Sequence, residues 1–588
     1  MKGSTRAKTA NPQTKTGTKV ARLIDCGNDV MLERDVRFEL SDGTTLVSDH
    51  YYPAGKPKAP TLLVRQPYGK DIATTVVYAH PLWFARHGFN VVIQDVRGRG
   101  ESEGDFYPFR FEGKDGAETI EWLAGRPECN GRIGMYGFSY QGITQLLAAA
   151  EQPKGLQCLA PAQTCGDLYH GWFYLNGILR LASTLGWATQ MLRSDAHRLN
   201  LKKQATALDA AMAGAAPFLH FTPYGKLPHL TAPRLPVYYA DWVKHQQHDD
   251  YWKKLDISTR WNKIIHPALH VVGWYDTYLN GSIQLYENLA QKAGTAFARE
   301  NQYLIAGPWQ HIPWGNYIGE EDLGSSALVD TDEILLRWFN HWLKDSGEFK
   351  SEPKINLFAL GENKWHPRTT WPGFAPQKST QWFLHSGGKA NSTRGNGSLT
   401  SSAPSSDELR DVFVYDPEVP VMAPGGMNAA PGPFTQNRLQ QGNNVLVYTS
   451  PELKERFHLV GSPRVKLFAQ TSRSTTDFVA TLCKVDGRGK STNITLGAAR
   501  SDFLFARGGF KPDQVCCWEF SLEATSCVFQ PGERIRLQIS SSAYPLLDRN
   551  SGSSVHPAEA TPRDWLRACQ QIVHTPEAAS CLELPGEA

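Results

Sequence analysis

The sequence lacks a long apolar run and any segment typical of a secretion signal. It has 588 residues, of which 41% are hydrophobic. No stretch approaches the roughly 20 consecutive apolar residues that a membrane-spanning helix requires. Residues 1–20 are rich in Lys and Thr and contain no apolar core of the kind found in signal peptides. We therefore predict a cytoplasmic protein with no membrane partner.

The sequence also lacks a strong excess of charge and any C-x-x-C pair. Its 61 Lys and Arg residues nearly balance 58 Asp and Glu residues, for a formal net charge of +3, which argues against nucleic acid as a partner. Ten Cys are scattered, and only Cys516 and Cys517 adjoin. No H-E-x-x-H motif occurs, and the segment 487–491 ends like a P-loop but has Lys484 where the first Gly is required. We therefore predict no metal and no cofactor.

Short apolar strands alternate with helices in the first third of the chain. Residues 36–40 and 45–52 predict a hairpin, and 61–64 and 89–94 predict buried strands. Asp115 and Glu118 resemble a capping box that opens a helix. This alternation is typical of a parallel α/β sheet with right-handed crossovers, whose site lies at the carboxyl ends of the strands.

The pattern of predicted helices and strands changes twice further along the chain. A helical stretch interrupts the sheet pattern, which then resumes, and short alternating strands with Gly, Pro and Ser turns follow. The last region predicts an all-β sandwich of the jelly-roll type. The predicted division is a flexible tail (1–34), a first part of the α/β core (35–165), a helical cap (166–260), a second part of the core (261–350) and the jelly-roll domain (351–588).

The strongest chemical signal is Ser139, in the segment Gly-Phe-Ser-Tyr-Gln-Gly at 137–142. An apolar strand precedes it and good helix formers follow. A sharp strand-to-helix turn strains the backbone of the residue at its tip, and neighbours without a Cβ leave room for that turn. The turn exposes the hydroxyl and directs backbone N–H groups at its target. Ser139 is therefore the candidate nucleophile.

Two further residues complete a candidate triad. A serine hydroxyl needs a base to accept its proton and an acid to hold that base in the correct tautomer. Asp276 and His311 each follow a predicted strand, in the order Ser, Asp, His that is found in α/β-hydrolases. The long gap between Ser139 and Asp276 is what an inserted cap would produce.

Several motifs together resemble the cocaine esterase-like hydrolases, which are related to the X-prolyl dipeptidyl peptidases and the α-amino acid ester hydrolases. The similarity runs from about residue 35 almost to the end of the chain, through segments at 65–70, 95–104, 137–142, 273–276, 307–311, 337–343, 361–365 and 540–550. The resemblance implies an α/β-hydrolase core, a helical cap and a C-terminal jelly roll. It also implies Ser139 as nucleophile, His311 as base and Asp276 as its partner, with the Tyr68 hydroxyl and the Tyr140 backbone N–H as oxyanion donors.

The substrate pocket is less defined by sequence. Trp172 and Phe173 in the cap and Tyr278 after the acid are candidates for an aromatic wall, although aromatic side chains are equally good core material. The acidic run 320–322 is the only one near His311 and reads as a solvated loop, so recognition of a substrate amino group is not supported.

Four functions remain open at this point. The first is a serine esterase or amidase that forms an acyl-Ser139 intermediate on a small-molecule ester or amide. The second is an acyltransferase with the same intermediate, and the third an X-prolyl-type peptidase. The fourth, a non-catalytic binding protein, conflicts with the intact Ser139, Asp276 and His311. A homodimer is left open.

Overall fold

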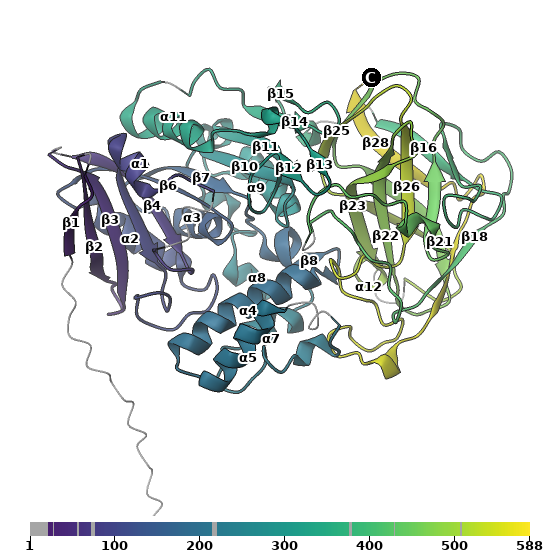
Figure 1. Ribbon diagram of the computed structural model, residues 1–588, viewed down its shortest axis with the longest axis horizontal. Helices are drawn as coiled ribbons and strands as arrows, with labels where there is room; N and C mark the ends of the chain where they lie inside the picture. Colours follow the sequence, from purple (N-terminus) through teal and green to yellow (C-terminus); the bar gives the residue numbers. More distant parts are fainter. Residues whose placement is uncertain are drawn as a thin grey trace, which may run out of the picture.

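The chain forms three adjoining parts: a large sheet with flanking helices, a group of helices, and a second β-rich part (Figure 1). The computed structural model describes residues 22–27, 29–55, 58–71, 77–214, 220–347, 349–374, 379–427, 430–505 and 509–587. Most of the predicted tail, residues 1–21, lies outside the described residues. Among the described residues, no helix has both the length and the apolar character needed to cross a bilayer.

The first sheet comprises eleven strands in the described residues: β1 (Arg22–Asp25), β2 (Val30–Glu39), β3 (Thr45–Pro53), β4 (Ala59–Gln66), β5 (Asn90–Asp95), β6 (Cys129–Phe138), β7 (Leu156–Ala162), β10 (Ala268–Tyr275), β11 (Gln302–Gln310), β14 (Ile355–Ala359) and β15 (Lys364–Arg368). Their spatial order is β1-β2-β3-β5-β4-β6-β7-β10-β11-β14-β15. Strands from β5 to β14 pair in parallel, and the strands at both edges pair antiparallel. This mixed sheet with crossover helices is consistent with the predicted α/β-hydrolase core.

Helices cover both faces of this sheet, and side-chain alternation explains why. Leu63 of β4 belongs to the apolar core shared with α2 (Glu112–Ala124) and α3 (Tyr140–Ala150). Its neighbours Leu62 and Val64 belong to the opposite core, with α1 (Pro81–Arg86) and α11 (Thr331–Lys344). Burial on both faces requires near-continuous apolar strands, which is the pattern that the sequence shows.

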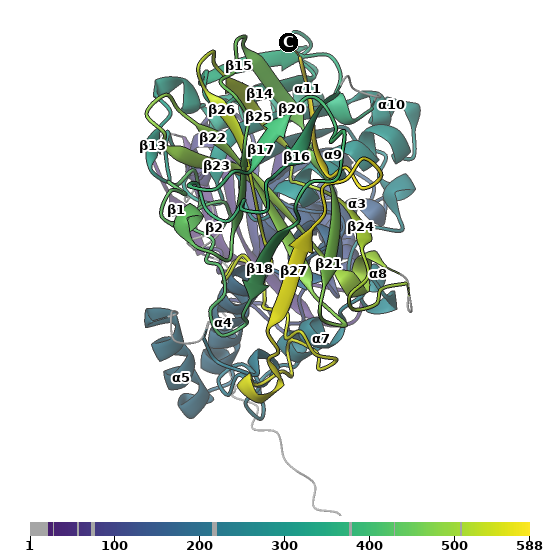
Figure 2. The ribbon, with the colours of Figure 1, turned by 90° about the vertical axis from the view of Figure 1, so that its right-hand side faces the viewer.

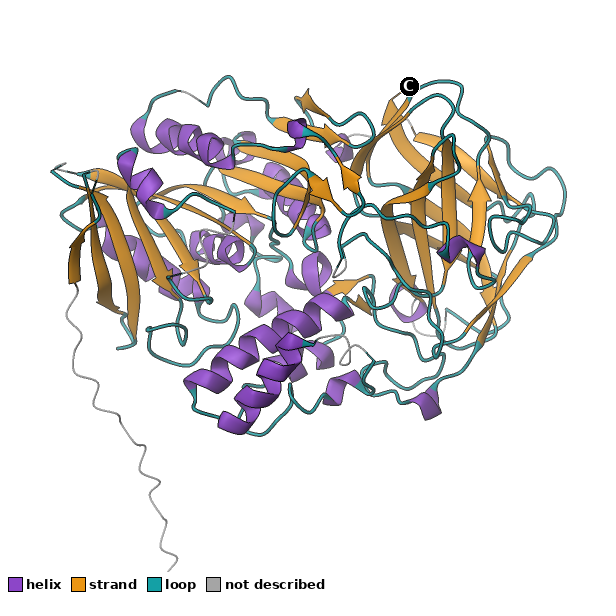
Figure 3. Ribbon diagram, in the orientation of Figure 1, coloured by secondary structure: helices purple, strands orange, loops and turns teal. Residues whose placement is uncertain are grey.

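The helical part lies below the sheet in Figure 3 and forms the cap. It contains a π-helical turn η2 (Tyr169–Phe173), a two-stranded ribbon β8 (Tyr174–Leu175) and β9 (Ile178–Leu179), and helices α4 (Leu181–Arg198), α5 (Lys202–Ala213), α7 (Tyr238–Lys244) and α8 (Asp250–Leu255). The start of α4 is anchored to the β-rich part, because the Leu181 N–H donates to Leu546 O at 3.0 Å. The cap is therefore held between the other two parts.

The second β-rich part contains thirteen strands in the described residues. Strands β18 (Asp411–Tyr415), β27 (Ala568–Ile572) and β21 (Arg464–Thr471) lie side by side on its outer face (Figure 2). The other strands are β16 (Ser379–His385), β17 (Ser398–Thr400), β19 (Leu446–Thr449), β20 (Phe457–Gly461), β22 (Asp477–Val485), β23 (Ser491–Arg500), β24 (Cys516–Ser521), β25 (Thr525–Phe529), β26 (Arg534–Ser540) and β28 (Cys581–Glu587). Its detailed topology as a jelly roll remains a prediction.

The structure differs from the sequence prediction at several element boundaries. Strand β1 and the start of β2 fall inside the predicted tail, and β14 and β15 belong to the first sheet although they follow residue 351. The predicted capping box is wrong, because α2 begins at Glu112. Asp115 lies within the helix and pairs with Arg97 at 2.8 Å, and Glu118 accepts the Ser41 N–H at 2.7 Å.

Candidate active site

Ser139 lies at a strained turn between β6 and α3. Its backbone has φ +61° and ψ −129°, in a region that non-glycine residues rarely occupy. A Cβ on Gly137 would lie 2.5 Å from Gln141 Cβ, and a Cβ on Gly142 would lie 2.6 Å from Thr164 Cβ. The two glycines thus allow a turn that places the Ser139 side chain at the carboxyl end of the sheet.

Gln141, which stands where the general G-x-S-x-G pattern has its second Gly, stabilises this turn. Gln141 is buried, and its Oε1 accepts the Phe138 N–H at 3.3 Å. Its Nε2 donates to Gln66 Oε1 at 3.1 Å, and Gln66 in turn donates to Gly69 O at 2.8 Å. This chain of amides connects the Ser139 turn to the loop after β4, which carries Tyr68.

His311 and Asp276 follow β11 and β10, which are adjacent parallel strands. His311 Nδ1 lies 2.5 Å from Asp276 Oδ2. Asp276 has no exposed surface, and its Oδ1 accepts the Tyr278 N–H at 2.7 Å. Gln163 supports the same region, since its Nε2 donates to Gln310 O at 3.1 Å. The carboxylate can therefore fix the imidazole so that its other nitrogen faces the cavity.

The two predicted oxyanion donors, Tyr68 and Tyr140, lie on different elements: Tyr68 follows β4 and Tyr140 begins α3. Tyr68 is half-buried after β4, where burial raises the pKa of its hydroxyl against the opposing effect of hydrogen bonds with Trp187 and Ser139. The Tyr68 phenol therefore stays protonated and able to donate. The Tyr140 side chain points away, because its hydroxyl donates to Glu112 at 2.8 Å. Its backbone N–H opens α3 and has no partner within the helix.

A cavity of about 450 Å³ joins these groups. Its polar lining residues are Tyr68, Ser139, Gln141, Ser183, Gln190, Thr277, Tyr278 and His311, and its apolar and indole ones are Phe138, Trp172, Trp187 and Ile312. A volume of this size suits a small organic ligand. No Asp, Glu, Lys or Arg is among these residues, so within the described chain no carboxylate, ammonium or guanidinium group lines the cavity.

The predicted aromatic wall is present in part. Tyr278 stacks on Trp172 with ring centroids 4.9 Å apart and on His311 at 5.6 Å, and both Trp172 and Tyr278 line the cavity. Phe173 does not line it. Its ring is buried against Trp242 and Trp252, at 4.9 Å from each, because successive residues of η2 point in different directions.

Sequence reasoning missed one wall of the cavity, the face of α4 that carries Ser183, Trp187 and Gln190. These residues are spaced i, i+4 and i+7, which places them on one side of a helix. Trp187 Nε1 lies 3.4 Å from the Tyr68 hydroxyl. This spacing was the one sequence signal that could have identified the wall. It was not enough, because a helix face with Ser, Trp and Gln can equally well be exposed to solvent.

Ser139 and His311 line the same cavity without a direct hydrogen bond. In the part of the chain that the structure describes, the Ser139 hydroxyl is near the phenol groups of Tyr68 and Tyr278. Burial raises the pKa of both phenols, and hydrogen bonding with Ser139 partly opposes that rise. Hydrogen bonds between catalytic groups often form fully only when substrate is bound. The arrangement therefore requires a small movement of the hydroxyl toward the imidazole.

Known proteins are similar in sequence to this chain over nearly its whole length. The profile of the X-Pro dipeptidyl-peptidase (S15 family) matches residues 42–313, and that of the X-Pro dipeptidyl-peptidase C-terminal non-catalytic domain matches residues 347–583. Cocaine esterase of Rhodococcus sp. (strain MB1 Bresler) is 31% identical over 573 residues, which cover 94% of this chain and 98% of that protein. The chain belongs to the cocaine esterase-like family of serine hydrolases. It is therefore a hydrolase that acts on ester or peptide bonds.

Other relatives agree with the family fold. A putative serine esterase of Mycobacterium bovis is 26% identical over 85% of this chain and 88% of that protein. The solved structure of an α-amino acid ester hydrolase superposes with a TM-score of 0.77 at 23% identity, covering 98% of this chain and all of that one. An archaeal aminopeptidase, from a marine sediment Thaumarchaeota archaeon, gives a TM-score of 0.78 at 22% identity, with 99% and 100% coverage. Both superpositions show that this chain has the same overall fold as these two proteins.

Proposed function

We propose that the protein cleaves small, uncharged esters through an acyl intermediate on Ser139. Ser139 Oγ attacks the substrate carbonyl carbon while His311 Nε2 accepts the hydroxyl proton. Asp276 stabilises the resulting imidazolium. The observation that carries the proposal is a single cavity that holds Ser139, His311 and Tyr68, with the buried Asp276 2.5 Å behind His311.

The tetrahedral intermediate has its oxyanion bound by two donors. The Tyr68 hydroxyl and the Tyr140 N–H both lie beside Ser139, one on the loop after β4 and the other on the first residue of α3. Preorganised donors of this kind stabilise the charge that develops in the transition state. His311 then returns the proton to the leaving alcohol, and water attacks the acyl group with His311 as base.

The lining of the cavity favours an apolar or aromatic acyl group. Trp172, Trp187 and Tyr278 supply flat rings, and Ser183 and Gln190 add neutral polar contacts on the same helix face. A peptidase that recognises a free amino terminus needs an acidic partner for the ammonium group. No carboxylate lines the described cavity, so an ester or amide without a charged amine fits better than an X-prolyl peptide.

Two arms of one experiment test the proposal. Nitrophenyl esters of graded acyl size and the matching anilides are assayed with the wild type, Ser139→Ala and Ser183→Ala. The proposal expects turnover of esters that is lost in Ser139→Ala and kept in Ser183→Ala, because Ser183 also lines the cavity but has no base. Equal activity of Ser139→Ala and wild type would refute it.

A competing amine separates hydrolysis from acyl transfer. Products formed in the presence of an excess of hydroxylamine or a primary alcohol are quantified during the same turnover. The proposal expects the free acid as the main product at moderate acceptor concentration. Dominant transfer to the acceptor would instead assign the same acyl-enzyme to an acyltransferase.

Location and assembly complete the proposal. We place the protein in the cytoplasm, which fractionation of the producing cells tests by comparing soluble, membrane and exported fractions. A homodimer is the simplest assembly to examine, and sedimentation equilibrium of the full chain would report its mass directly.

A further inference from the structure

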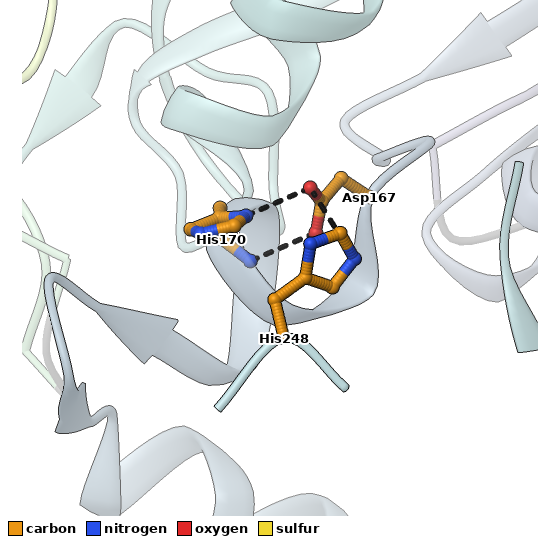
Figure 4. Close-up of side chains that lie close together, drawn as sticks. All are labelled: Asp167, His170 and His248. Atoms are coloured by element: carbon orange, nitrogen blue, oxygen red, sulfur yellow. Dashed lines mark hydrogen bonds and ion pairs between the residues drawn. The ribbon is translucent and has the colours of Figure 1, made fainter. Parts of the chain in front are cut away.

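A second cluster of reactive side chains lies in the cap, outside the residues that line the Ser139 cavity. Asp167 lies just before η2, His170 lies within η2, and His248 comes from the loop between α7 and α8. Figure 4 shows the two imidazoles converging on the carboxylate from opposite elements. One potential ligand atom from each of the three side chains lies within 4.8 Å of the other two.

The contacts within the cluster orient these ligand atoms. His170 Nδ1 is 2.8 Å from Asp167 Oδ2, and His248 Nε2 is 3.9 Å from the same oxygen. The second oxygen, Asp167 Oδ1, accepts the His170 backbone N–H at 2.9 Å, which fixes the plane of the carboxylate. Ser258 Oγ lies 3.2 Å from His248 Nε2, the same nitrogen that faces Asp167. An outer hydrogen bond such as the one on Asp167 Oδ1 is typical around metal ligands.

The separations suit a small divalent ion. Zn²⁺ holds nitrogen and oxygen ligands at about 2.0–2.2 Å, so two ligands of a tetrahedral site lie about 3.3–3.6 Å apart. The separations of 2.8 Å and 3.9 Å lie on either side of this distance. Asp167, His170 and His248 are all partly exposed, so an ion and a water molecule can reach them. Two imidazoles and one carboxylate favour zinc or a similar transition metal over Ca²⁺ or Mg²⁺.

A comparison within the molecule shows what distinguishes this cluster. Glu33, His50 and Glu128 also lie close together, but Arg126 pairs with both glutamates, so a cation is already supplied. Asp167 faces two imidazoles instead.

We propose that Asp167, His170 and His248 bind one zinc-type divalent ion, with water as a fourth ligand. The ion replaces the proton between His170 Nδ1 and Asp167 Oδ2, and it also replaces the hydrogen bond between Ser258 Oγ and His248 Nε2. It connects η2, which carries Trp172, to the loop between α7 and α8. The site therefore stabilises the cap, and the acyl chemistry at Ser139 does not depend on it.

Metal titration of the full chain without a polyhistidine tag tests the site. Chelator-treated protein is titrated with Zn²⁺ in competition with a chromophoric chelator, and with Co²⁺, whose visible absorption is intense only at four-coordinate sites. Variants His170→Gln and His248→Gln each remove one ligand. His245→Gln is the matched control, because His245 lies in the same loop but pairs with Asp249 at 2.6 Å.

The proposal expects one Zn²⁺ per wild-type chain and per His245→Gln chain, with a higher thermal midpoint when the ion is present. Each ligand variant binds at least about tenfold more weakly. Wild-type protein that binds no Zn²⁺ would overturn the proposal, and so would equal affinity in the wild type and both ligand variants. If a ligand variant fails to fold, the wild-type stoichiometry and Co²⁺ spectrum still decide.

Discussion

Tyr68 contributes to the proposed chemistry through one hydroxyl proton. We expect Tyr68→Phe to lower kcat by about 10²–10³-fold, because one preorganised oxyanion donor is lost while the ring still fills its place. KM should change little. Steady-state kinetics on a nitrophenyl ester measure both constants, and near-full turnover of a folded Tyr68→Phe enzyme would exclude Tyr68 from the oxyanion site.

In the proposed mechanism Asp276 acts through His311, and substitution of Asp276 tests that role. Asp276→Asn keeps an oxygen for the Tyr278 N–H but presents an amide to His311 Nδ1, which favours the wrong tautomer. We expect a loss of about 10⁴-fold in kcat with an unchanged thermal midpoint. If Asp276→Asn retained most of the turnover, His311 would not depend on this carboxylate.

A buried acid outside the triad predicts a pH dependence of stability. Burial raises the pKa of Asp95 from 3.8 to about 7. Between these values the folded state binds the proton that the unfolded state has lost, so stability falls as pH rises from about 4 to 7. Asp95→Asn removes that titration. The thermal midpoint should therefore decrease less between pH 5 and pH 8 in Asp95→Asn than in the wild type. Equal decreases in the two proteins would contradict this assignment.

Two helical glycines show how the surroundings of an element decide the sign of a substitution. Gly142→Ala in α3 places a Cβ 2.6 Å from Thr164 and should cost about 1–3 kcal/mol in the free energy of unfolding. Gly186→Ala in α4 meets no atom within 4 Å and should stabilise by about 0.5–1 kcal/mol. Thermal unfolding of both variants measures the contrast, and a stabilised Gly142→Ala protein would contradict the tight turn at Ser139.

The sequence predicted elements well where local pattern and burial agree. The strand and helix around Ser139, and the strands that precede Asp276 and His311, were found because apolar runs end at Gly or polar residues. Boundaries failed where tertiary contacts override local signals. The predicted helix start at Asp115 is one case, since that carboxylate pairs with Arg97 instead of capping a helix.

The candidate site could also be predicted only in part from the sequence. Single residues at strand ends could be assigned, because chain order and topology place them together. The cavity wall could not, since Trp187 and Gln190 face it only through the packing of α4 against the sheet and the second β part. The misassigned Phe173 has the same cause, because neighbouring residues of η2 divide between the cavity and the core.

At the scale of the whole molecule, a buried ion pair connects the cap to the β-rich part. Arg180, just before α4, pairs with Glu523, and both side chains are almost fully buried. Burial raises the pKa of Glu523, and the charge of Arg180 opposes that rise. The two parts therefore depend on each other for stability.

Substitution of either partner tests that dependence. Arg180→Met leaves Glu523 buried without its partner and should cost about 3–5 kcal/mol. Arg193→Met in α4 is the control, because the pair that Arg193 forms with Asp209 is exposed to solvent. This substitution should leave the thermal midpoint nearly unchanged. Equal thermal midpoints for Arg180→Met and Arg193→Met would show that the pair does not hold the parts together.

In the proposed mechanism, side chains from the sheet part and the cap line one cavity and together make the Ser139 hydroxyl reactive. Mass spectrometry of protein treated with a fluorophosphonate measures this directly. The account predicts one adduct per chain, on the peptide that contains Ser139, and a much slower reaction in folded His311→Ala protein. Absence of an adduct on Ser139 in folded wild-type protein, or equal rates in wild type and His311→Ala, would contradict it.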